Sequence, residues 1–184
     1  MKKEIKKEMK KEVISTVLYL LGVICVTWLI VTFVGQRTQV SGTSMSTTLQ
    51  DGDNLIVDKL SYRFQDPERF DIIVFPWRYE ESTYYIKRII GLPGESLWIT
   101  EQGEIYIDGV LLEEHYDARP YGSGAVGSSE RPIVLGQDEY FVMGDNRNNS
   151  SDSRKPEVGN IKRSEIIGKA MYRIWPLSKI GTLD

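Results

Sequence analysis

The residues that could carry out chemistry lie in three polar or mixed stretches: SGTSMSTTL at 41–49, TYYIKRII at 83–90 and MGDNRNNSSDSR at 143–154. In the first, Ser and Thr fill six of nine positions. A cluster of this kind is usually a solvated turn. One of its hydroxyls could act as a nucleophile only if a base from another part of the chain took its proton.

The composition argues against histidine and metal chemistry. A Ser-His-Asp triad needs a placed histidine, and the chain has one, His115, which stands beside a Gly- and Ser-rich segment and is more typical of a surface residue. A zinc site needs three or four His, Cys or acidic ligands. The single cysteine, Cys25, lies within an apolar run. We therefore expect no metal, no cofactor and a base other than histidine.

Lysine can serve as that base if it is neutral. Its pKa of about 10.4 in water falls by several units when the side chain is buried. In TYYIKRII the alternation of a strand places Tyr85, Lys87 and Ile89 on one face, so Lys87 has apolar neighbours. The pattern alone leaves open an edge-strand lysine that opposes aggregation.

In the third stretch, Asp152 and Arg154 could pair, and a serine could donate to a neutral lysine nitrogen.

The elements that must position these residues are short strands. Turn-rich segments separate eight β-type runs, at 54–60, 71–77, 83–90, 96–100, 104–109, 131–135, 139–144 and 168–175. Such spacing predicts an all-β sandwich or barrel-like domain. Residues 162–167 could form one helical turn, and 117–130 read as a flexible surface loop.

An uncharged run of 22 residues, 13–34, precedes the β domain. Its length matches a membrane-spanning helix. It exceeds the apolar region of a cleaved secretory leader, and it lacks the polar stripe of a globular helix. Lysines in residues 1–12 favour a cytoplasmic N-terminus. We therefore predict a basic cytoplasmic segment at 1–12, a transmembrane helix at 13–34 and an extracytoplasmic β catalytic domain at 35–184.

The distribution of charge along the chain indicates which kinds of partner the outer domain could bind. The chain carries a formal −3, while its first twelve residues, with six Lys and three Glu, carry +3, so the remainder carries −6. An acidic outer domain argues against nucleic-acid binding.

A lone cysteine excludes an intrachain disulfide framework.

Taken together and in this order, the apolar segment, SGTSMSTTL, RFDIIVF, YIKRIIGLPGE and GDNRNNSSDSR resemble the bacterial type I signal peptidases, membrane-anchored endopeptidases with a Ser/Lys dyad, over nearly the whole chain. The resemblance implies that Ser44 is the nucleophile and Lys87 the general base. It implies that Ser150 hydrogen-bonds the lysine, while Asp145, Arg147, Asp152 and Arg154 support the loop. Backbone N–H groups near Gly42 and Ser44 would meet the oxyanion.

The resemblance also implies the substrate, signal peptides of exported pre-proteins with small residues at −1 and −3. The bilayer would be a further partner, and the secretion translocon is left open as another. Shallow substrate pockets would be walled by Val40, Met45, Leu49, Tyr85 and Ile86. The aromatic stretch 75–85 is either a core strand with its turn or a surface resting in the membrane interface.

Three positions depart from the family pattern. Thr47 replaces a proline that would stiffen the turn, Phe70 replaces a glycine, and Glu95 replaces an aspartate.

Two alternative functions remain. One is a specialised or non-catalytic pilin-assembly relative of the same family. The other is a self-cleaving repressor-type Ser/Lys protease, which the apolar segment and the acidic outer domain oppose.

Overall fold

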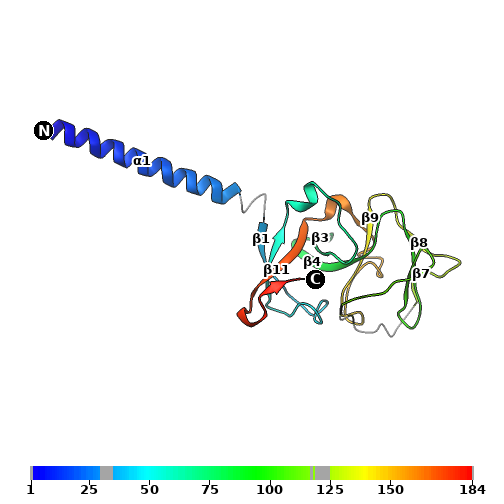
Figure 1. Ribbon diagram of the computed structural model, residues 1–184. Coiled ribbons are helices and arrows are strands. Elements are labelled where there is room, and N and C mark those ends of the chain that lie inside the picture. The colour runs from blue at the N-terminus through cyan, green and yellow to red at the C-terminus, as the bar shows by residue number, and fades with distance from the viewer. Residues whose placement is uncertain (1, 30–34, 117, 119–124, 184) are drawn as a thin grey trace.

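The computed structural model describes residues 2–29, 35–116, 118 and 125–183, and shows one long helix joined to a β domain (Figure 1). Helix α1 spans Lys2–Leu29, so the basic segment belongs to the same helix as the apolar run. Its part Met9–Leu29 is long and apolar enough to cross a membrane, and none of it is buried against the domain. Residues 30–34 of the predicted span lie outside the described residues.

The described strands form two antiparallel sheets, which confirms the mainly β prediction. The larger sheet has the order β1-β2-β11-β3-β4-β9-β10, with β12 paired to β11, and the smaller has the order β7-β6-β5-β8. The strands of the larger sheet are β1 Gly35–Gln39, β2 Asn54–Asp58, β3 Ile72–Trp77, β4 Glu80–Gly91, β9 Glu139–Met143, β10 Ile161–Lys162, β11 Gly168–Trp175 and β12 Gly181–Thr182. Those of the smaller are β5 Ser96–Ile99, β6 Ile105–Ile107, β7 Val110–Leu111 and β8 Ile133–Val134.

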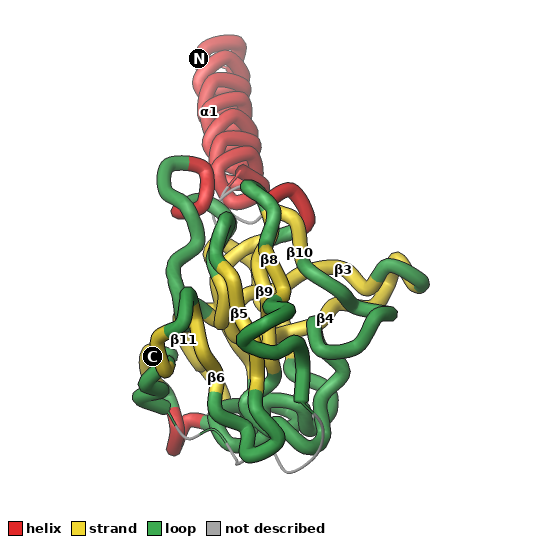
Figure 2. The backbone as a smooth tube through the Cα atoms, turned by 90° about the vertical axis from the view of Figure 1, so that its right-hand side faces the viewer, coloured by secondary structure: helices red, strands yellow, loops and turns green. Residues whose placement is uncertain are grey.

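Each of the eight predicted runs overlaps a strand, and the predicted helical turn contains a 3-10 helix at Arg163–Glu165. Away from α1, the described chain is almost entirely strand and loop (Figure 2). The sequence analysis missed β1, β7, β10 and β12. β1 is the polar sequence GQRTQ at a sheet edge, so no apolar alternation marks it. In the predicted flexible loop, Val126 is held by a bridge to Ile99, while residues 117 and 119–124 lie outside the described part of the chain.

Strand β4 organises the centre of the larger sheet. It lies between β3 and β9, with Ile73 opposite Lys87 and Met143 opposite Arg88. Ile86 joins one buried apolar cluster and Ile89 joins another, so β4 contributes side chains to cores on both sides. A lysine in this strand is therefore surrounded by packed structure, and the alternative of an exposed edge-strand lysine is wrong.

Candidate active site

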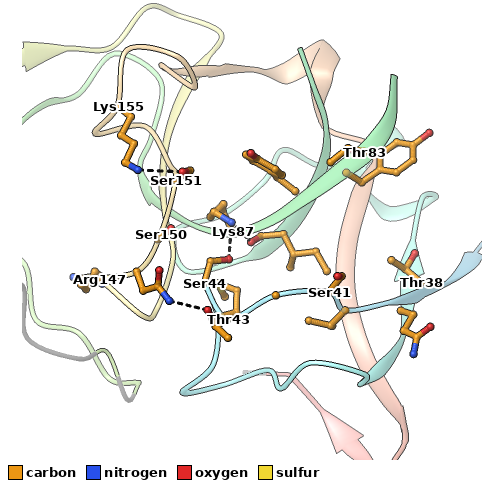
Figure 3. Close-up of a pocket in the computed structure, with 18 of the residues that line it drawn as sticks. Thr38, Ser41, Thr43, Ser44, Thr83, Lys87, Arg147, Ser150, Ser151 and Lys155 are labelled. Carbon is orange, nitrogen blue, oxygen red and sulfur yellow. Dashed lines mark hydrogen bonds between the residues drawn. The ribbon is translucent and has the colours of Figure 1, made fainter. Parts of the chain in front are cut away.

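The structure brings Ser44 and Lys87 together. Ser44 lies in the turn between β1 and β2, and its Oγ is 2.8 Å from Lys87 Nζ (Figure 3). The lysine is 4% exposed. Its Nζ also donates to the Ile86 carbonyl oxygen at 2.9 Å and lies 4.9 Å from the centre of the Tyr85 ring. A hydroxyl and a buried amine at this distance can exchange a proton.

Burial is the main influence on the pKa of Lys87. It lowers that pKa from 10.5 to about 8, because the charged form loses its hydration. The carboxylates of Asp152 and Asp145 act in the opposite direction by stabilising the ammonium. A substantial fraction of the amine is therefore neutral at mildly alkaline pH.

The turn that carries Ser44 is closed by its own backbone. Thr48 N–H and Leu49 N–H both donate to the Met45 carbonyl, at 2.8 and 2.6 Å. Met45 and Leu49 are buried in the cluster that contains Ile86. Thr47, which stands at the family's proline position, has a buried Oγ1 without a hydrogen-bond partner. The turn is thus closed without the proline.

Side chains and backbone from the loop after β9 hold the same turn from outside. Asn146 N–H donates to the Ser44 carbonyl at 3.0 Å, and its side-chain amide donates to the Thr43 carbonyl at 3.0 Å. Asn149 donates to Thr43 Oγ1 at 2.8 Å. The turn that carries Ser44 and the 145–149 segment, a hundred residues apart in sequence, are therefore one hydrogen-bonded unit.

Two buried ion pairs support this loop. Asp152 and Arg154 pair as predicted, with two N–O distances of 2.8 Å. Asp145 pairs with Arg88, at 3.0 and 2.9 Å, and both side chains are only 1% exposed. Removing one member of such a pair leaves a buried charge uncompensated, at a cost of about 3–5 kcal/mol. The sequence analysis did not identify Arg88, although it directly follows Lys87.

Arg147 pairs with a residue that the sequence analysis passed over. Its guanidinium donates to Glu114 Oε2 at 3.0 Å and to the Tyr116 hydroxyl at 2.9 Å. The Tyr116 ring also lies 3.9 Å from Arg88 Cζ. Glu114 and Tyr116 lie in the connection between β7 and β8 of the smaller sheet. No sequence spacing rule predicts that they contact the 143–154 stretch. His115, between them, is exposed, and its ring packs edge-on against Phe70 rather than against the dyad.

Two expected roles differ from the geometry. The Gly42 N–H donates to Asp51 Oδ1 at 2.8 Å, so it is not available as an oxyanion donor in this arrangement. Ser150 Oγ is buried without a regular hydrogen bond, so the expected bond to Lys87 is not formed. It lies near the Asp152 carboxylate and helps to lower the pKa of that group. The Ser44 N–H makes no hydrogen bond to any described residue and remains suited to be an oxyanion donor.

A cleft of about 770 Å³ is lined by both Ser44 and Lys87. Of the predicted pocket residues, Val40, Met45, Tyr85 and Ile86 line it. Leu49 does not, because its side chain is fully buried in the apolar cluster under the turn. Among the described residues, no group of three or more His, Cys, Asp or Glu side chains is arranged to hold a metal ion.

Gly144 is a further residue that the sequence analysis missed. A Cβ at this position would lie 2.5 Å from the Ser44 carbonyl oxygen and 2.7 Å from Ser150 Cβ. Its N–H donates to Asp152 Oδ2 at 3.0 Å. Only glycine lets the strand end approach the Ser44 turn this closely.

Comparison with known proteins agrees with this arrangement. The family model "Signal peptidase, peptidase S26" matches residues 11–175. The chain belongs to this family. It is 37% identical to "Probable signal peptidase I-2" of Synechocystis over 96% of the chain and 76% of that protein. It is 40% identical to a signal peptidase I of Leptolyngbya laminosa, over 83% of the chain and 74% of that protein. It is 37% identical to that of Bacillus caldolyticus, over 86% of the chain and 89% of that protein.

The family match covers the apolar part of α1 together with the β domain as far as the end of β11. A helix suited to cross a membrane and a peptidase domain are thus parts of the same family unit. This organisation disfavours the repressor-type alternative. A specialised pilin-type relative would belong to the same family, so the family match does not distinguish it from a general signal peptidase.

Proposed function

We propose that this chain is a signal peptidase I, a membrane-anchored serine endopeptidase that removes signal peptides from exported pre-proteins. The observation that carries the proposal is the 2.8 Å contact between Ser44 Oγ and Lys87 Nζ, both of which line the cleft. The proposal is supported by the family membership and by relatives named signal peptidase I.

In the proposed reaction, neutral Lys87 accepts the Ser44 hydroxyl proton while Ser44 Oγ bonds to the scissile carbonyl carbon. The Ser44 N–H faces the oxyanion. The lysine ammonium then gives its proton to the leaving amine, and the C–N bond breaks. Water, deprotonated by the lysine, attacks the carbonyl carbon of the acyl-enzyme ester. The bond from that carbon to Ser44 Oγ then breaks, the lysine ammonium returns its proton to Ser44 Oγ, and the signal peptide leaves with a new carboxylate.

The proposed location follows from α1. Lysines at its start favour a cytoplasmic N-terminus, which places the β domain and its cleft at the outer membrane face. In the aromatic stretch 75–85, Trp77 stacks on Tyr85 at 4.8 Å, whereas Tyr79 is exposed at the tip of the β3–β4 hairpin. The stretch is thus partly core, and its tip is suited to the membrane interface. The bilayer and the translocon are proposed partners.

Cleavage of a defined pre-protein tests the function. The full-length protein, purified in detergent, should cut a pre-protein with an Ala-x-Ala site directly after the second alanine, as mapped by mass spectrometry of both products. A matched pre-protein with Leu at −1 should remain uncut. Inactivity on the Ala-x-Ala substrate together with cleavage of a pilin-type precursor would favour the specialised relative. Inactivity on both would contradict the enzymatic proposal.

The pH dependence should report the protonation of Lys87. Because the base must be neutral, and burial lowers its pKa only to about 8, kcat/KM should rise with pH and reach half its maximum near pH 8. Below that pH it should fall about tenfold per unit. The rates should be measured from pH 6 to 10, with tryptophan fluorescence at each pH to show that the protein stays folded. A flat profile between pH 6 and 9 would contradict a titrating lysine base.

A further inference from the structure

The cleft continues past the dyad on both sides. In Figure 3, Thr38, Ser41 and Thr83 lie on one side of Ser44 and Lys87, and Ser151 and Lys155 lie on the other. The first side is formed by β1 and β4, and the second by the loop after β9. A peptide bound across Ser44 therefore has one part against each side.

The connection to α1 indicates in which direction a substrate peptide would cross the cleft. β1 begins at Gly35, six residues after the end of α1 at Leu29, and six residues span at most about 20 Å. The β1 side of the cleft is thus tied close to the end of the proposed membrane anchor. The apolar part of a signal peptide stays in the bilayer, so its last residues would enter on this side. The first residues of the mature chain would then leave against the 147–155 loop.

The two sides differ from the rest of the domain in charge. No Asp or Glu is among the described residues that line the cleft, although the whole chain has 26 acidic and 23 basic residues. Four cations among the described residues line the cleft. Lys87, the dyad base, and Arg147 are buried, and the side chain of Arg154 is only 6% exposed. Both arginines pair with carboxylates. Lys155 is the exposed one. Its Nζ contacts Ser151 Oγ at 3.1 Å, and no carboxylate of the described residues pairs with it.

We propose that the Lys155 end of the cleft binds the first residues of the mature chain and favours a carboxylate side chain there. The inference rests on the proposed function and adds a specificity determinant on the leaving side of the cut. The chemistry is a simple charge pair: an Asp or Glu at the first or second mature position meets an exposed ammonium with no competing carboxylate in the cleft. A basic residue at the same position is repelled.

Three pre-proteins that differ only in Glu, Gln or Lys at the second mature position test this. The full-length protein in detergent should give kcat/KM in the order Glu, Gln, Lys, with steps of about two- to fivefold, as expected for an exposed charge pair. The differences should shrink between about 0.05 and 0.5 M salt because of screening. Lys155→Glu should reverse the order. Lys179→Glu changes an exposed lysine that does not line the cleft, and should keep the wild-type order.

The ratio of rates within each variant is the decisive quantity, because it cancels any effect of the new carboxylate on the pKa of Lys87. Equal rates for the three substrates at low salt, or an unchanged order in Lys155→Glu, would overturn the inference while leaving the proposed function standing. Failure to cut any of the three after the alanine would overturn the proposed function and this inference with it.

Discussion

Lys87→Met should reduce kcat by roughly 10⁴-fold or more, as should Ser44→Ala, because either change removes half of a unit that transfers one proton. Methionine approximates the length of the lysine side chain and fills the same buried space between Tyr85 and Ser44. The loss would thus come from the missing amine. Single-turnover cleavage of the Ala-x-Ala pre-protein, with purified variants in detergent, measures it.

The double variant Ser44→Ala/Lys87→Met sharpens this result. If the two side chains act as one unit, it should be no slower than either single variant. Lys179→Met, at an exposed position outside the cleft, should match wild type. Lys87 has no carboxylate in direct ion-pair contact among the described residues, so Lys87→Met should unfold at the same temperature as wild type or higher. Activity of Lys87→Met within tenfold of wild type would remove the lysine from the mechanism.

The contact between Ser44 and Lys87 could be anticipated from local sequence signals together with the resemblance to a family. Lys87 stands in a strand whose alternation places apolar residues on its face, and its burial follows from the central place of β4 between β3 and β9. Ser44 lies in a hydroxyl-rich turn that the resemblance to a family distinguishes from an ordinary loop. The Asp152–Arg154 pair is similarly local, since the two residues are two positions apart.

The rest of the site depends on contacts between distant segments, which no spacing rule gives. Glu114 reaches Arg147 from the connection between β7 and β8, and Arg88 reaches Asp145 across the β4–β9 pairing. Gly42 has a positive φ of 94° and looked suited to present its N–H to substrate. The side chain of Asp51, nine residues later, takes that N–H instead. These hydrogen bonds and ion pairs depend on side-chain geometry in the folded protein, and they cannot be predicted from composition or sequence spacing.

Gly144 shows how tightly the chemistry depends on this long-range packing. The residue lies at the end of β9, where its backbone passes between the Ser44 carbonyl and Ser150. Gly144→Ala would place a methyl group 2.5 Å from that carbonyl oxygen, so the Ser44 turn and the end of β9 must move apart. A shift of about 1 Å at reacting atoms can cost 10²-fold in rate. We therefore expect kcat of Gly144→Ala to fall about 10²-fold, with about 1–3 kcal/mol lost from the free energy of unfolding because of overpacking.

Gly181→Ala is the matched control. A Cβ at Gly181, in β12, meets no atom within 4 Å, so this variant should keep both rate and stability. Cleavage rates and thermal unfolding of the two alanine variants, measured well below their unfolding temperatures, separate misplacement of Ser44 from loss of fold. A Gly144→Ala protein that cuts as fast as wild type would show that the close approach of β9 is not needed for catalysis. A folded but slow variant would show that the end of β9 sets the position of the nucleophile.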